Sequence, residues 1–158
     1  MSKKETLGTH VVTQIALVVK DVNKTAAAYS KILGLPVPEV MITGDPEAAR
    51  ATYRGQPTDA QAKLAFFDLG QVSLELIEPL GGDSVWQEVL DEKGEGVHHI
   101  AFQIKGTDEV TAALAEHGIP VIQQGHYTGG MYTYVDSEPA LGVMLELLEN
   151  FDTPNRAS

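Results

Sequence analysis

Three side chains stand in apolar strand-like runs where they could do chemistry. His99 lies in "GVHHIAFQI" (96–104), while Glu75 and Glu146 each lie between two leucines, in "LEL" at 74–76 and at 145–147. Successive side chains of a strand point to opposite faces, so each polar group is expected to face away from its apolar neighbours. By the same alternation, His98 is expected on the opposite face from His99, in a structural role. Two carboxylates in a half-apolar cavity are costly unless a cation or a proton accompanies them.

An internal repeat relates these residues to one another. "TQIALVVKDVNKTAAAYSKILGLPV" (13–37) matches "HHIAFQIKGTDEVTAALAEHGIPVI" (98–122), which aligns Gln14 with His99. "VSLELIEP" (72–79) matches "VMLELLEN" (143–150), which aligns Glu75 with Glu146. Each half therefore predicts the order strand–helix–strand–strand–strand.

The repeat predicts an α+β fold in which two tandem βαβββ modules form one cupped mixed sheet. We expect the first module at 9–80, a linker with one short helix at 81–96, the second module at 97–150, and tails at 1–8 and 151–158. The modules share one structural domain, with helices on one face of the sheet and a concavity on the other. The polar segment 44–61, punctuated by Gly and Pro, is expected to be a loop or lid.

Strand alternation turns four polar side chains of the repeat toward the concavity. These are Gln14, Glu75, His99 and Glu146. One amide oxygen, one imidazole nitrogen and two carboxylates suit a single divalent ion with open positions, whether Zn, Ni, Co, Mn, Fe or Mg.

Such a site predicts removal of a proton from the carbon next to a carbonyl group. Glu146, or Glu75 from the facing half, would be the base. Epimerases, isomerases and lyases share this step, so the reaction stays open among them. Tyr53, Tyr132 and His126 are candidates for the wall of the substrate pocket, although the tyrosines are equally typical of a core.

Composition excludes several classes of partner. A formal net charge of −11 disfavours nucleic acid and anionic membrane surfaces. No apolar run reaches the ~18–20 residues of a membrane-spanning helix, and "MSKKETLGTH" is not followed by the apolar region of a secretory signal. The chain has no cysteine, which excludes thiolate chemistry and cysteine-ligated metals. We expect a cytoplasmic protein with a small-molecule substrate.

The segments "QIALVVKDVNKTAAAYSKILGL", "KLAFFDLGQVSLELIEPL", "GEGVHHIAFQI" and "LGVMLELLE" resemble the vicinal oxygen chelate superfamily of glyoxalases, bleomycin resistance proteins and extradiol dioxygenases. The resemblance spans about residues 11–150 and implies paired βαβββ modules around one metal, and a homodimer. Locally the chain is most similar to methylmalonyl-CoA epimerase, whereas the order Gln, Glu, His, Glu is that of glyoxalase I.

Several positions depart from these relatives. Gln14 stands where the epimerases usually have His, and Asp59 where they tend to have Glu. Val18 stands where glyoxalase I has an Arg for glutathione. A non-catalytic binding protein of the bleomycin-resistance type and a ring-cleaving dioxygenase are the alternatives, although Gln14 replaces the first His of the dioxygenase triad.

Overall fold

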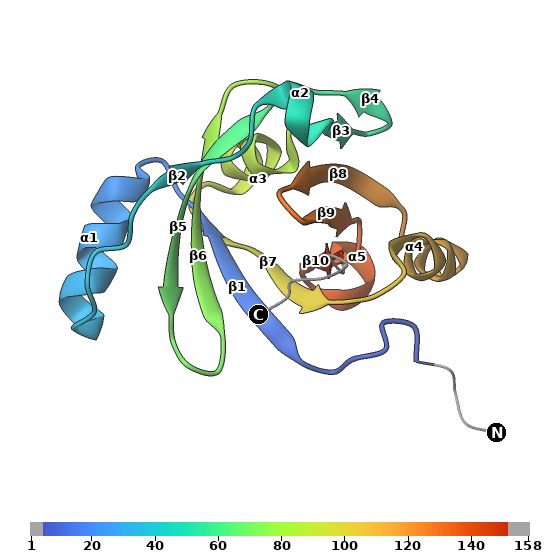
Figure 1. The fold of residues 1–158 in the computed structure, drawn as a ribbon, viewed down its shortest axis with the longest axis horizontal. Coiled ribbons are helices and arrows are strands. Elements are labelled where there is room, and N and C mark those ends of the chain that lie inside the picture. The colour runs from blue at the N-terminus through green and yellow to red at the C-terminus, as the bar shows by residue number, and fades with distance from the viewer. Residues whose placement is uncertain (1–4, 152–158) are drawn as a thin grey trace, which may run out of the picture.

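The computed structural model describes residues 5–151, which form a single curved sheet of ten strands with helices packed around it (Figure 1). The strands are β1 (Val12–Val18), β2 (Met41–Ile42), β3 (Thr52–Tyr53), β4 (Gln56–Pro57), β5 (Gln61–Asp68), β6 (Ser73–Leu80), β7 (Gly96–Gln103), β8 (Val121–Tyr127), β9 (Gly130–Val135) and β10 (Met144–Asn150). The helices are α1 (Val22–Leu33), α2 (Pro46–Ala49), α3 (Val85–Lys93), α4 (Thr107–Glu116) and α5 (Glu138–Leu141). The predicted α+β class and cupped mixed sheet are confirmed.

The order of the strands shows the internal repeat in space. The sheet runs β2-β5-β6-β1-β7-β10-β9-β8-β3-β4, so the first-half set β2-β5-β6-β1 is mirrored by β8-β9-β10-β7. Strand β1 pairs parallel with β6, β7 pairs parallel with β10, and β1 and β7 pair antiparallel at the centre. The four strands that carry the candidate ligands are therefore adjacent in the sheet.

Helices α1 and α4 cover the outer face of the two halves. Leu17 and Val19 of the first half pack with Val22 and Ala26 of α1. The equivalent cluster in the second half joins Ile100, Phe102 and Ile104 to Val110 and Leu114 of α4. The apolar face expected from strand alternation is thus the face that the helices bury, which leaves the other face to the cup.

A second carboxylate of each repeat fixes the start of its helix. Glu78 Oε1 accepts the backbone N–H of Val22 at 2.9 Å, and Glu149 accepts the N–H groups of Gly106 and Thr107 at 3.0 and 2.9 Å. Both glutamates stand three residues after a site glutamate, on the opposite strand face, where the positive end of the helix dipole lies. The Thr107 hydroxyl, followed by these backbone N–H groups, lowers the pKa of Glu149 by stabilising its charged form.

The linker helix α3 packs against the concave face of the cup. Val85 and Trp86 join a cluster with Ala16, Val18 and Tyr134, side chains that face away from α1 and α4. Ser84 begins the helix because its side chain accepts the backbone N–H of Gln87. The end of the cup next to α3 is filled by apolar and aromatic side chains.

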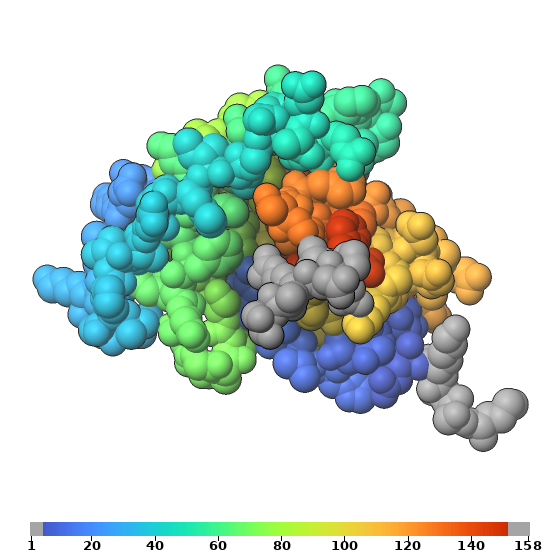
Figure 2. Space-filling model, viewed as in Figure 1, coloured from blue at the N-terminus to red at the C-terminus, as the bar shows by residue number. Residues whose placement is uncertain are grey.

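The segment 44–61 is more ordered than the predicted loop or lid. It contains α2 and the short hairpin β3–β4, and β3 pairs antiparallel with β8 of the second half, with Thr52 opposite Gln124. Figure 2 shows this segment lying along the second-half strands. Two-residue strands carry no periodic signal in a sequence, so this pairing could not be predicted.

Within residues 5–151, no helix combines the length and the apolar character needed to cross a lipid bilayer.

Candidate metal centre

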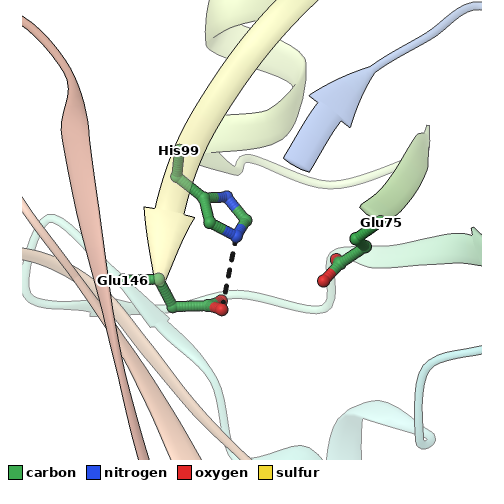
Figure 3. A group of neighbouring side chains, drawn as sticks. All are labelled: Glu75, His99 and Glu146. Atoms are coloured by element: carbon green, nitrogen blue, oxygen red, sulfur yellow. Dashed lines mark ion pairs between the residues drawn. The ribbon is translucent and has the colours of Figure 1, made fainter. Parts of the chain in front are cut away.

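The four central strands each contribute one polar side chain to a common point on the concave face. Gln14 comes from β1, Glu75 from β6, His99 from β7 and Glu146 from β10. One ligand atom each from Glu75, His99 and Glu146 lies within 4.8 Å of the others, and Figure 3 shows the three side chains converging. His99 Nε2 lies 3.0 Å from Gln14 Oε1 and 3.3 Å from Glu146 Oε1. The structure therefore brings all four predicted residues together.

Burial makes it costly for both carboxylates of this cluster to be charged at the same time. His99 is fully buried, and Gln14, Glu75 and Glu146 are between 4% and 9% exposed. Burial, with the nearby Glu146 carboxylate, raises the pKa of Glu75 well above its ordinary value. Two carboxylates and an imidazole with such short separations fit a divalent cation, which would relieve both the desolvation and the repulsion.

His98 does not face the opposite side of the sheet, contrary to the prediction from alternation. In the pairing of β1 with β7, Ala16 lies opposite His99 and the next residue, Leu17, lies opposite Val97, so His98 is the extra residue of a β-bulge. Its ring is buried, and its Nδ1 lies 2.8 Å from His99 Nδ1. Burial, followed by the neighbouring His99, lowers the pKa of His98 to about 3. Strict alternation fails wherever a bulge adds a residue.

One aromatic side chain of β9, Tyr134, packs against both histidines. The ring centroid of Tyr134 lies 5.0 Å from that of His99, and the Tyr134 hydroxyl accepts the indole N–H of Trp86 at 3.0 Å. Burial and the nearby Glu146 and Glu75 carboxylates raise the pKa of Tyr134 well above its ordinary value. These rings add to the burial of the site, and the low local dielectric of a buried site strengthens the polar interactions within it.

Tyr132, a predicted pocket residue, also lies near the cluster. Its hydroxyl accepts the side-chain N–H of Gln123 at 3.1 Å, and burial raises its pKa to about 12. Gln123 in turn accepts the backbone N–H of Val85 at 2.9 Å, which ties α3 to the strands behind the site. Sequence reasoning missed Gln123, because a glutamine in "VIQQGHY" carries no signal of its own.

Tyr53 and His126 are not drawn into the cluster. The Tyr53 hydroxyl bonds Glu88, and its ring lines an outer groove with Ser84 and Gln87. His126 lies three residues after Gln123 on β8, so alternation places it on the other sheet face, where its Nδ1 is buried without a hydrogen-bond partner. Their assignment to the pocket wall gains no support from this geometry.

Asp59, the residue offered in place of the epimerase glutamate, also lies elsewhere. A Cβ built on Gly82 would meet its Oδ1 at 2.7 Å, and it lines a second outer groove with that glycine. Asp59 therefore does not join the candidate metal ligands.

Comparison with known proteins agrees with this architecture. Residues 13–135 match the model of the glyoxalase/bleomycin resistance protein/dioxygenase superfamily. The chain belongs to this superfamily. Members of the superfamily include methylmalonyl-CoA epimerases, and human mitochondrial methylmalonyl-CoA epimerase is 32% identical over 103 residues, which cover 65% of this chain and 49% of that protein. The chain thus matches about half the length of this relative.

Two further proteins are similar to this chain. The uncharacterized protein YqjC of Bacillus subtilis is 37% identical over 95 residues, 58% of this chain and 67% of that protein. The crystal structure of methylmalonyl-CoA epimerase from Mycobacterium tuberculosis aligns with a TM-score of 0.64 at 18% identity, covering 96% of this chain and 94% of that one. This second likeness concerns the fold.

Proposed function

We propose that this chain is a metal-dependent enzyme that removes a proton from the carbon next to a carbonyl group, in an epimerase-like reaction. The observation that carries the proposal is the convergence of Glu75, His99 and Glu146 within 4.8 Å in the buried cup. The match to a superfamily that includes methylmalonyl-CoA epimerases supports it further.

Four residues would hold the metal: Gln14, Glu75, His99 and Glu146. Gln14 and His99 are neutral donors, and the two glutamates supply the negative charge that matches a divalent cation. When bound, the ion would polarise the carbonyl oxygen of the substrate and stabilise the negative charge that develops there.

The two carboxylates are the groups able to move the proton. Glu75 comes from β6 of the first half and Glu146 from β10 of the second, so they approach a bound substrate from different halves of the cup. Epimerisation needs a proton to leave one face of a carbon and return to the other, and two carboxylates from different halves of the cup could do this in turn, each through an oxygen that does not hold the metal. Isomerases and lyases need the same first step but one base only, so the paired arrangement favours the epimerase-like reaction.

The substrate class is a small molecule with a carbonyl and a second oxygen, either a CoA thioester or a hydroxy-ketone-like adduct. Two of the cations that could meet CoA phosphates already pair with carboxylates, since Arg54 contacts Glu88 at 2.7 Å and Lys63 contacts Glu78 at 3.4 Å. The test therefore includes both classes. A homodimer and a cytoplasmic location stay predictions.

The experiment is solvent exchange at the acidic carbon. Protein loaded with Zn²⁺, Co²⁺ or Mn²⁺ is incubated in D₂O with methylmalonyl-CoA or with a hemithioacetal of glutathione, and deuterium uptake is followed by NMR. We expect uptake with the wild type and at least about 10²-fold slower uptake with Glu146→Gln, which removes a general base and a metal ligand together. Glu116→Gln, an exposed change on α4, is the matched control.

Two outcomes would contradict the proposal. Undiminished exchange in both Glu146→Gln and Glu75→Gln would show that neither carboxylate takes part in the reaction. Tight, stoichiometric binding of these compounds without any exchange would instead assign the chain to the binding proteins of the superfamily.

A further inference from the structure

His98 occupies an unusual place beside the site. The bulge in β7 turns its ring toward His99, at a centroid separation of 5.1 Å and an interplanar angle of 85°. Its Nδ1 lies 2.8 Å from His99 Nδ1, and its Nε2 lies 3.2 Å from the carbonyl oxygen of Val85, the first residue of α3. A chain of contacts therefore runs from the linker helix through His98 to His99.

The chemistry of these atoms sets the position of each proton. A carbonyl oxygen only accepts hydrogen bonds, so His98 Nε2 must carry the proton that faces Val85. The His98 ring is 3% exposed and its two ring nitrogens contact an imidazole and a carbonyl, so it is neutral, because a buried charge without a counter-charge is costly. Its Nδ1 then has only a lone pair to offer.

The lone pair on His98 fixes the tautomer of His99. If His99 Nδ1 also lacked a proton, two lone pairs would face each other across 2.8 Å, so His99 Nδ1 carries the proton and donates it. In neutral His99 the Nε2 is then a bare lone pair. It faces two acceptor oxygens, Gln14 Oε1 at 3.0 Å and Glu146 Oε1 at 3.3 Å, so these three atoms must share a cation or a proton.

We propose that His98, braced by the Val85 carbonyl, is a positioning residue that holds His99 in the Nδ1-protonated form and so presents Nε2 as a metal ligand. Ligating histidines usually donate their second N–H to a carboxylate, carbonyl or water. Here the His98 imidazole accepts that N–H. The hydrogen bond from His98 Nε2 to the Val85 carbonyl of the linker helix fixes the orientation of the His98 ring. The inference rests on the proposed function for the identity of the occupant, a divalent cation, but the tautomer itself does not.

The first test reads the tautomer in a metal-free variant that keeps only His98 and His99. His10, His117 and His126 are replaced by Gln, which leaves the two adjacent histidines of the five in the chain. Long-range ¹H–¹⁵N correlation spectra then show which imidazole nitrogens carry protons. We expect His99 protonated at Nδ1 and His98 at Nε2, and the reverse assignment for His99 would overturn the proposal.

The second test measures Zn²⁺ affinity by competition with a chromophoric chelator. His98→Phe keeps a ring of similar size but cannot accept the His99 proton, and we expect about 10–100-fold weaker binding. His98→Gln keeps an acceptor and a donor, so it should retain more of the affinity than His98→Phe. Wild-type affinity in His98→Phe would overturn the proposal.

The two tests separate this proposal from the proposed function. Should His98→Phe fail to fold, the spectra of the protein that retains the histidine pair decide the question alone. Absence of Zn²⁺ binding in the wild type, together with the expected tautomer, would contradict the proposed metal enzyme while leaving the hydrogen-bond relay in place.

Discussion

Glu75 is the residue on which the electrostatics of the site depend most. It is 5% exposed, and burial beside Glu146 raises its pKa well above the ordinary value. In the metal-free protein the folded chain therefore keeps a proton on Glu75 that the unfolded chain releases. Since the folded state binds more protons, stability falls as pH rises from the unfolded pKa, near 4.5, toward the raised folded pKa.

Glu75→Gln should remove this pH dependence. In the presence of a chelator, the free energy of unfolding of the variant minus that of the wild type should increase from pH 5 to pH 7, by up to about 1.4 kcal/mol per pH unit. Urea titrations at three pH values measure this difference. His98 has a pKa of about 3, so its contribution to the free energy of unfolding rises with pH between about 3 and 6.5. This contribution is present in both proteins and cancels in the difference. A constant difference would show that Glu75 ionises freely in the folded protein.

Residue types and the internal repeat were enough to predict which side chains share the cup. Gln14 with His99 and Glu75 with Glu146 occupy equivalent strand positions, and regular alternation carried all four to one face. The same rule failed at His98, because nothing in "GVHHIAF" indicates a bulge. The contact between His98 and the Val85 carbonyl could not be predicted either, because it depends on where the linker helix packs against the sheet.

The helices depend on carboxylates that repeat along with the site residues. Glu149 accepts two backbone N–H groups and the Thr107 hydroxyl at the start of α4, whereas Glu78 accepts only the Val22 N–H of α1. Asp21 already provides a separate cap for α1 through the Lys24 N–H. The same glutamate position thus caps a helix in both repeats, but Glu149 makes more of the capping hydrogen bonds of α4 than Glu78 makes of those of α1.

Glu149→Ala should destabilise the protein by about 1 kcal/mol, the usual cost of losing a helix cap, and Glu78→Ala should cost less. Chemical denaturation at pH 7 gives both values. Neither change should alter metal affinity, because both side chains bond helix starts on the opposite face from the site. A loss of metal binding in Glu149→Ala as large as in Glu146→Gln would contradict the separation of the two faces.

Elements with a clear period were predictable, and short ones were not. The strands of the repeat and helices α1, α3 and α4 show regular spacing of apolar residues. In segment 44–61 the sequence showed only residues typical of turns. The segment nevertheless forms α2 and the short strand β3, which pairs with β8. The pairing of β3 depends on contacts with β8, a strand distant in the sequence, so the local sequence does not predict it.

At the scale of the molecule, the site joins the two halves of the sheet. Gln14 and Glu75 belong to the first half, and His99 and Glu146 to the second. An ion held by all four would therefore stabilise the folded protein by linking both halves, and would bind the unfolded chain only weakly.

Metal at 100 times its Kd should raise the free energy of unfolding by about 2.7 kcal/mol. For a chain of this size that corresponds to a rise in Tm of about 5–10 °C. Differential scanning calorimetry with and without Zn²⁺ measures the change. Glu146→Gln should show little of it, and an equal rise in that variant would indicate that the ion binds elsewhere.

The most direct measurement is the metal content of purified protein after equilibration with Zn²⁺, Co²⁺ or Mn²⁺ and removal of unbound ion. We expect one ion per wild-type chain, a strong loss in Glu75→Gln, His99→Ala and Glu146→Gln, and full content in the surface variant Glu116→Gln. Full metal content in all three site variants, or none in the wild type, would contradict this expectation.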